Sequence, residues 1–216
     1  MTAQGYMSDE WLLSYAAGSL SEAHSVLVAT HVDFHPEMQQ TVRDAEAIGG
    51  ALMEDSAPAP LAATALGDVL SRIDALSVDE EEAPQPLRCG DPISLTEYLG
   101  KNLDDLRWRT MGPGMKHVKL WSGPKGEKLW LLKAKGGTQV PLHDHTGAEM
   151  TLVLRGGFKA KGVHYTPGML EFADEDITDH FPQIDDGEDC ICLVVTEAPI
   201  RLHSFVGKIF QRIIGL

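Results

Sequence analysis

Cysteine and long apolar runs are scarce in this chain of 216 residues. Its three cysteines, Cys89, Cys190 and Cys192, are an odd number without the spacing of a disulfide framework, which favours a reducing compartment. No apolar run approaches the roughly 20 residues that a membrane-spanning helix needs. The N-terminus also has no basic segment followed by an apolar core, so no signal peptide is recognisable. We therefore expect a cytoplasmic protein that does not interact with membranes.

Basic side chains are almost missing from the first 82 residues, which carry 15 acidic residues but only Arg43 and Arg72. Residues 83–216 carry 17 acidic and 16 basic residues and are nearly neutral. The acidic balance argues against direct binding to nucleic acid, because phosphates are met by Lys and Arg. Solvated helix faces are the commoner cause of a charge run. The step in composition nevertheless predicts two domains with different partners.

The first part of the chain predicts four helices. Two serines that suit helix N-caps, a proline that suits a first turn and one apolar repeat of helical period give their positions. The expected helices run from Ser8 to near Gly18, from Ser21 to about His31, from Pro36 towards Gly49 and Gly50, and through Leu66, Val69, Leu70 and Ile73. None is apolar enough to be stable alone, so we expect them to pack as a small bundle.

The second part of the chain has the pattern of a β structure. Short runs rich in β-forming residues are separated by turns roughly every 8–12 residues, at positions 119–121, 128–132, 149–154, 169–172 and 190–195. This spacing predicts a sandwich or barrel of antiparallel strands. The predicted fold is therefore α+β, with a helical domain at residues 1–77, an acidic linker at 78–90 and a β domain at 91–216. The apolar tail at 204–216 is expected to dock on the barrel.

The most specific local pattern is HDHTGAE, from His143 to Glu149. His143 and His145 are two residues apart, so on a strand they point to one face, which Glu149 can reach across a turn. Imidazole and carboxylate suit a divalent transition metal, with zinc expected first and iron, nickel or manganese as alternatives. His180 follows the turn at 165–168 and is expected to supply a fourth ligand. The predicted metal ligands are thus His143, His145, Glu149 and His180.

These residues resemble the first motif of the cupin family, because Gly137 and Gly156 also stand at that motif's spacing. The second cupin motif is matched only loosely, by Gly162, Pro167 and Gly168, since His180 comes later than the motif requires. The resemblance implies a small antiparallel, jelly-roll-like barrel with a metal inside. Some cupins are metal-dependent oxygenases, whereas a complement of four protein ligands tends to mark a structural or sensory metal.

The helical part resembles the N-terminal domain of ChrR-type anti-sigma factors, in which a helical domain precedes a cupin. The similarity lies in residues 9–20, 22–31 and 49–52, and it continues at 187–193 and 204–205. It implies a regulatory protein, not an enzyme, that binds an extracytoplasmic-function sigma factor and keeps its target genes silent. It also implies that the cupin responds to singlet oxygen or related oxidants. A basic sigma factor would complement the acidic helices.

One part of the family's pattern is not kept. The zinc motif of the helical domain, HxxxCxxC with an earlier His, retains only His31; His35 and Met38 replace the cysteines, and Tyr6 stands at the earlier position. Tyr and Met are poor zinc ligands. We therefore expect no tight zinc in the helical domain, although His31, His35 and a nearby acid such as Asp33 could hold a weak one.

Two other functions remain open at this point. A cupin oxygenase acting on a small, diketone-like molecule would need an open coordination position and a pocket leading to it. A metal-storage or sugar-binding module is the third alternative. Cys190 and Cys192 should face one side of a strand, either as a redox pair or as small packing residues. The histidines outside the motifs are expected at the surface or in packing: His117, His164 and His203.

Overall fold

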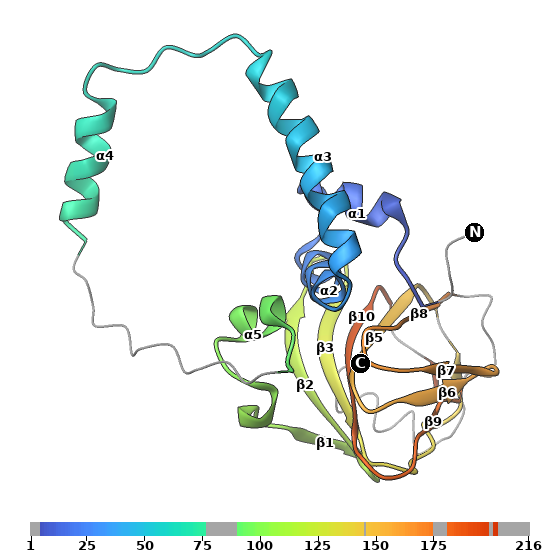
Figure 1. Ribbon diagram of the computed structural model, residues 1–216. Coiled ribbons are helices and arrows are strands. Elements are labelled where there is room, and N and C mark those ends of the chain that lie inside the picture. The colour runs from blue at the N-terminus through green and yellow to red at the C-terminus, as the bar shows by residue number, and fades with distance from the viewer. Residues whose placement is uncertain (1–4, 77–89, 145, 175–180, 199–200, 203–216) are drawn as a thin grey trace.

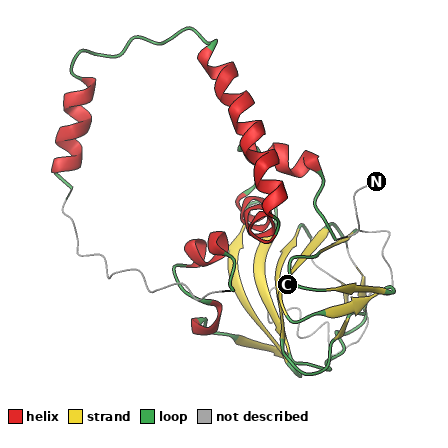
Figure 2. Cartoon of the chain, viewed as in Figure 1, coloured by secondary structure: helices red, strands yellow, loops and turns green. Residues whose placement is uncertain are grey.

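Helices come first and an antiparallel β structure follows in the computed structural model (Figures 1 and 2). The structure describes residues 5–76, 90–144, 146–174, 181–198 and 201–202. The helices are α1 (Asp9–Ala16), α2 (Glu22–Phe34), α3 (Pro36–Glu54), α4 (Ala65–Asp74) and α5 (Ile93–Leu99), with a 3-10 turn at Leu103–Asp105. The predicted linker and C-terminal tail fall almost wholly outside these ranges, so both stay predictions.

The strands form three antiparallel sheets within the described residues. The largest has the order β1-β2-β3-β10-β5-β8, made of Arg109–Gly112, Met115–Ser122, Lys128–Ala134, Cys190–Thr196, Glu149–Arg155 and Leu170–Ala173. A second sheet has the order β7-β6-β9, made of Val163–Tyr165, Phe158–Ala160 and Gln183–Ile184. A short pair joins β11 (Arg201–Leu202) to β4 (His143–Asp144). The predicted α+β class with an antiparallel, jelly-roll-like β part is confirmed, although the ladders between the described strands do not close into one barrel.

The first four helices occur where the sequence predicts them. Ser21 caps α2, because its Oγ accepts a hydrogen bond from the backbone N–H of His24. The end predicted for α3 is wrong, since that helix continues past Gly49 and Gly50 to Glu54. Each glycine costs about 1 kcal/mol of helix propensity relative to alanine, but good helix formers flank the pair and no proline interrupts the helix.

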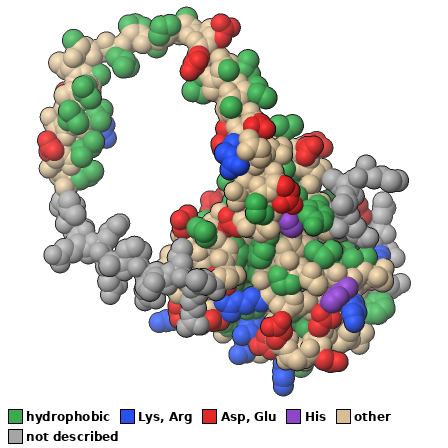
Figure 3. Space-filling model, in the orientation of Figure 1, with side chains coloured by type: hydrophobic (Ala, Val, Ile, Leu, Met, Phe, Trp, Pro, Cys, Tyr) green, Lys and Arg blue, Asp and Glu red, His purple; other side chains and the backbone are tan. Residues whose placement is uncertain are grey.

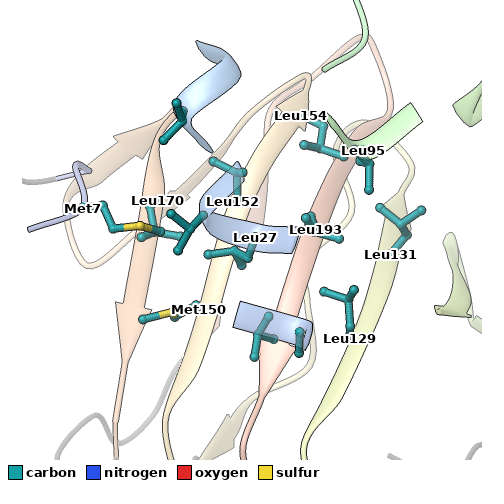
Figure 4. Close-up of a cluster of buried hydrophobic side chains, with 14 of the residues drawn as sticks. Met7, Leu27, Leu95, Leu129, Leu131, Met150, Leu152, Leu154, Leu170 and Leu193 are labelled. Carbon is teal, nitrogen blue, oxygen red and sulfur yellow. The ribbon is translucent and has the colours of Figure 1, made fainter. Parts of the chain in front are cut away.

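One face of the six-stranded sheet carries the helices. Along β10, Ile191, Leu193 and Val195 point to this face, because successive side chains of a strand alternate. They share one buried cluster with Leu27 and Val28 of α2. Figure 4 shows Leu27 lying over the leucines of the central strands. The buried side chains of α1, α2 and α3 thus join the core of the sheet.

The opposite face of the sheet is turned towards the smaller three-stranded sheet. A second buried cluster lies there, in which the rings of Phe158 and Tyr165 stack with centroids 4.9 Å apart. Cys190, Cys192 and Trp130 contribute to the same cluster from the large sheet. This side is the interior of the jelly-roll-like structure.

Helix α4 does not join the predicted bundle. Helices α1, α2 and α3 pack on one another, whereas no residue of α4 is buried. Its apolar side chains Leu66, Val69, Leu70 and Ile73 are 51–71% exposed. Figure 1 shows that α3, the connecting segment 55–64 and α4 form a wide arch, in which α4 lies away from the sheet. The expectation of a four-helix bundle is therefore wrong for this helix, because its apolar face meets no complementary surface of the described chain.

Helix α5 was not predicted from the sequence. It begins after Pro92 and ends at Gly100, whose φ of +64° suits a residue without a side chain. The carboxylate of Asp33 in α2 accepts hydrogen bonds from Ser94 N (2.7 Å) and Ser94 Oγ (3.0 Å). Leu95 is fully buried in the helix-facing core. The segment after the linker is therefore held against both α2 and the sheet.

Candidate functional site

His143 is held as a metal-binding histidine needs to be. It lies in β4 and is 5% exposed. Its Nδ1–H donates to the carbonyl oxygen of Pro141 at 2.8 Å. Because a carbonyl can only accept, the neutral ring keeps its lone pair on Nε2, the atom that would bind a metal. The local geometry of His143 thus fits the predicted role.

Glu149 begins strand β5 and is half-buried. One of its oxygens, Oε1, accepts a hydrogen bond from Thr151 Oγ1 at 3.3 Å. Strand alternation places Glu149 and Thr151 on the interior side of the sheet, the side opposite Leu152 and its helix-facing core. Carboxylate oxygen is a suitable ligand for a divalent transition metal. Glu149 therefore also fits the predicted site.

The other two predicted ligands, His145 and His180, lie outside the described residues. Within the described ranges, no three His, Cys, Asp or Glu side chains gather closely enough to hold a metal ion. The convergence of all four predicted ligands therefore stays a prediction.

A second interior carboxylate, Glu171 of β8, was missed by the sequence analysis. It is 6% exposed and pairs with Thr151 across the β5–β8 ladder. The charges of Glu171 and Glu149 both act to raise the pKa of Cys192, so the two carboxylates face the same interior. In the sequence, only strand alternation indicates the position of Glu171: Leu170 faces the helices, so the next residue must face the interior.

The two interior cysteines face the same side, as predicted. Their Sγ atoms are 3.6 Å apart and both residues are buried thiols. The hydrogen bond between the Cys192 and Cys190 thiols, followed by burial, raises the pKa of Cys192 well above its ordinary value. A protonated thiol is a poor nucleophile. The surroundings of Cys190 and Cys192 therefore favour their interpretation as small packing residues over that of a redox pair.

A cavity of about 370 Å³ adjoins the segment that leads to His143. It is lined by Gln139, Val140, Pro141, Leu142 and Phe181. Pro141 is also the residue whose carbonyl oxygen holds the His143 ring. The cavity beside the segment before His143 is thus lined mostly by apolar residues.

The helical positions that replace a zinc motif form an aromatic cluster. The His31 and His35 rings have centroids 4.5 Å apart, and the Tyr6 ring lies 4.7 Å from that of His35. His31 is fully buried, and burial, with a smaller effect of His35, lowers its pKa to about 4. Met38 is buried in α3, while Asp33 binds Ser94. Weak metal binding by His31, His35 and Asp33 stays a prediction, as does the absence of tight zinc.

Of the histidines outside the motifs, the two that the structure describes lie at the surface or in packing, as predicted. His164 is at the surface, where its Nε2 lies 2.6 Å from Asp185 Oδ2. His117 is buried in β2, and burial followed by the charge of Arg109 lowers its pKa. His203 lies outside the described residues.

A second candidate site is the apolar surface of the arch. It consists of exposed large side chains from the end of α3 to the end of α4: Ile48, Leu52, Met53, Leu61, Leu66, Val69, Leu70, Ile73 and Leu76. Figure 3 shows hydrophobic side chains along α4 and the outer part of α3. Among the described helices, none combines the length and the apolar character that crossing a membrane requires. Exposed apolar patches of this kind mark interaction sites.

Both the helical and the β part of the chain are similar to known proteins. Residues 97–199 match the family model of the ChrR cupin-like domain. The chain is 40% identical over 215 residues to the anti-sigma-E factor ChrR of Cereibacter sphaeroides, covering 98% of each protein. A crystal structure of Rhodobacter sphaeroides SigE in complex with ChrR matches with a TM-score of 0.74 and 38% identity. That match covers 90% of this chain and 100% of the other.

These similarities span the helices as well as the β part, so the expected order of helical and cupin-like regions is confirmed. They also confirm the prediction of a regulatory protein and decide against the oxygenase, since the relative is an anti-sigma factor. The chain belongs to the ChrR family of anti-sigma factors.

Proposed function

We propose that this protein binds an extracytoplasmic-function sigma factor through the apolar surface of its arch. The observation that carries the proposal is the uncovered face of α4, where Leu66, Val69 and Leu70 are each more than half exposed. Leaving such side chains in water forfeits about 25 cal/mol for every Å² that a partner could cover. A sigma-factor domain seated between α3 and α4 would bury them.

Charge supports the same surface. Acidic side chains border the apolar residues of the arch, among them Glu54, Asp55, Asp68 and Asp74. Regions of a sigma factor that contact DNA and polymerase are expected to be basic. Opposite charges speed the encounter of two proteins and fix their orientation. The acidic part of the chain thus avoids nucleic acid and attracts a protein that binds it.

The mechanism we propose is sequestration in the cytoplasm. While the helices hold the sigma factor, its surface is covered and core RNA polymerase cannot bind it, so the target genes stay silent. The related structure, a complex of SigE with ChrR, supports the first step of this mechanism, the binding of a sigma factor. No catalytic turnover is involved.

Co-purification tests the proposal. The full chain is co-expressed with an extracytoplasmic-function sigma factor encoded beside it, and one chain is captured through a tag. The expected result is a stoichiometric complex. Two separately eluting proteins, with the full chain folded by circular dichroism, would overturn the proposal.

A metal centre in the cupin-like part is the second element of the proposal. His143 and Glu149, with His145 and His180, would hold one divalent ion, for which zinc is the first choice. On a tetrahedral zinc ion, four protein ligands leave no position for substrate, so the ion would brace the loops that carry its ligands. Metal analysis of the full chain should give one equivalent, and His143→Ala should lose it. Two equivalents would show that the helical region also binds metal tightly.

Oxidant sensing completes the proposal. Oxidation at the metal centre would change the contacts of these loops with the helices and release the sigma factor, whereas a chain without the metal still binds the sigma factor but lacks this response. The test exposes the purified complex to singlet oxygen from an illuminated dye. Release is expected from the wild type, while His145→Ala should bind the sigma factor but release none in response to the oxidant. A His145→Ala complex that still responds would contradict a sensing role for the metal.

A further inference from the structure

Helix α2 is tied to a loop of the β structure at each of its ends. At its start, His24 lies near Glu197, which follows β10. At its end, His35 bonds to Gly168, in the turn between β7 and β8. Between these contacts the helix lies on the six-stranded sheet. Both loops thus contact a helix that belongs to the core.

The hydrogen bonds at the start of α2 determine which ring nitrogen of His24 carries the hydrogen. Ser21 Oγ accepts from the backbone N–H of His24, so its own hydrogen can be donated to His24 Nδ1, at 2.8 Å. The ring hydrogen then lies on Nε2, which is 3.6 Å from Glu197 Oε1. His24 is buried and its ring stacks on Trp11 of α1, with centroids 5.2 Å apart. This contact therefore reaches both α2 and α1.

Glu197 is in turn attached to the loop of the candidate metal ligands. Its backbone N–H donates to Ala148 O at 2.9 Å, next to Glu149. Ala198 packs on Gly147, where an added Cβ would lie 2.9 Å from the Ala198 Cβ. Glu197 and Ala198 are thus attached to Gly147 and Ala148, directly before the candidate ligand Glu149.

The contact at the end of α2 is built differently. His35 Nε2 lies 2.8 Å from Gly168 O, and a Cβ added to Gly168 would lie 3.0 Å from Phe34 Cβ. The neighbouring strand is paired as well, because Leu170 N donates to Gly5 O. This end joins α2 to β8 and has no contact with the loop at 143–149 among the interactions described above.

We infer that the contact between His24 and Glu197 is the route by which the state of the loop at 143–149 reaches the helices that bind the partner. The inference rests on the proposed sigma-factor function. From His24 the route runs through Trp11 to α1, which packs on α3, the helix that leads into the apolar arch. Two sites are coupled only if a contact between them differs between two states of the protein. His24 and Glu197 act here as positioning residues.

A mutant cycle tests the inference. Glu197→Gln keeps the size of the side chain but removes its charge. The matched control is Tyr98→Phe, which removes another tie of α2, the hydrogen bond from Tyr98 Oη to Glu22 Oε1 (2.7 Å). The Kd for the sigma factor is measured for each full-length protein with and without His143→Ala. The same proteins are measured with one equivalent of ZnCl₂ and with EDTA, in case His143→Ala does not fold.

In the wild type and in Tyr98→Phe, His143→Ala or EDTA should change the Kd by about fivefold or more, the lower end of measured allosteric couplings. In Glu197→Gln the change should be less than about twofold, the usual limit for independent sites. An equal change in all three proteins overturns the inference.

Hydrogen exchange of the full chain without a sigma factor tests the coupling separately from sigma-factor binding. His143→Ala or EDTA should speed amide exchange in α1 and α2 of the wild type, and Glu197→Gln should suppress this difference. If that pattern appears but no sigma factor binds, the coupling stands and the proposed function falls. If sigma factor binds and the pattern is missing, the proposed function stands and the coupling falls.

Discussion

Helices α2 and α4 are similar in length but have opposite surroundings. Of the 13 residues of α2, seven are buried, and the helix touches the sheet, α3 and α5. None of the 10 residues of α4 is buried, although its apolar residues recur at helical spacing. The sequence makes an apolar face in both helices. What differs is the covering surface, which the described residues supply for α2 but not for α4.

This difference assigns the two helices different tasks. The face of α2 is complementary to the sheet, so its burial stabilises the fold in every state of the protein. The face of α4 is left uncovered by the described residues, so its burial in a complex would stabilise binding. The helical region is therefore partly core and partly interaction surface. Mutations on the two helices should separate stability from binding.

The largest expected effect is on folding, from Leu27→Ala in α2. Leu27 is fully buried between the helices and the sheet. Its truncation should lower the free energy of unfolding by about 2–5 kcal/mol, because it leaves a cavity. Urea unfolding of the full chain measures this. Leu66→Ala in α4 is the control and should change the value by less than about 0.5 kcal/mol; equal losses would erase the contrast between the helices.

The next effect is a pH dependence that α2, but not α4, should produce. Burial and His35 lower the pKa of His31 to about 4, against about 6.5 in the unfolded chain. The folded state therefore binds this proton less readily, and stability present above pH 6.5 should be lost as the pH falls towards 4. The loss from this group is up to about 3 kcal/mol.

Urea unfolding at several pH values, compared between the wild type and His31→Leu, checks this dependence. The variant should show a weaker fall between pH 6.5 and 4. Parallel curves for the two proteins would mean that His31 takes up its proton as easily in the folded state as in the unfolded one.

A charge on α4 should act on binding alone. Leu70→Asp places a carboxylate in the apolar face and should weaken sigma-factor binding by about 2 kcal/mol, roughly thirtyfold in Kd, as hot-spot residues do. Its unfolding free energy should stay within about 0.5 kcal/mol of the wild type. Ser71→Asp, away from the apolar face, is the matched control. Equal weakening by both substitutions would point to net charge and not to the apolar face.

The smallest effect is expected from Tyr98→Phe. Burial and the hydrogen bond to Glu22 raise the pKa of Tyr98 to about 12, so the phenol donates throughout the neutral range. Losing this hydrogen bond between α5 and α2 should lower the free energy of unfolding by about 0.5–1.5 kcal/mol. Differential scanning calorimetry measures the change. A loss as large as that of Leu27→Ala would show that α5, and not the sheet, holds α2.

Much of the local structure could be predicted from the sequence. Ser21 caps a helix, and the spacing of Leu66, Val69 and Leu70 is helical, so α2 and α4 were found. The alternating strands around residues 149–154 and 190–195 appear as β5 and β10. The pattern at His143 also predicted a residue that the structure holds in the right tautomer. Each of these signals is local in the chain.

The rest depends on contacts between distant residues. Periodicity shows that a face is apolar but not what covers it, so α4 was wrongly placed in a bundle. Helix α5 was missed because it is short and contains the β-branched residues Ile93 and Thr96, and it is held by the distant Asp33. The contact of His24 with Glu197 joins residues that no local pattern links.

Hydrogen exchange of α4 in the presence and absence of the sigma factor tests the central claim most directly. Helix α4 has no buried side chain in the free chain, so its amides should exchange within seconds there. Saturating sigma factor should protect residues 65–74 strongly, while α2 is slow in both states. A complex that forms and leaves α4 as unprotected as before would contradict the claim that this helix is the binding surface.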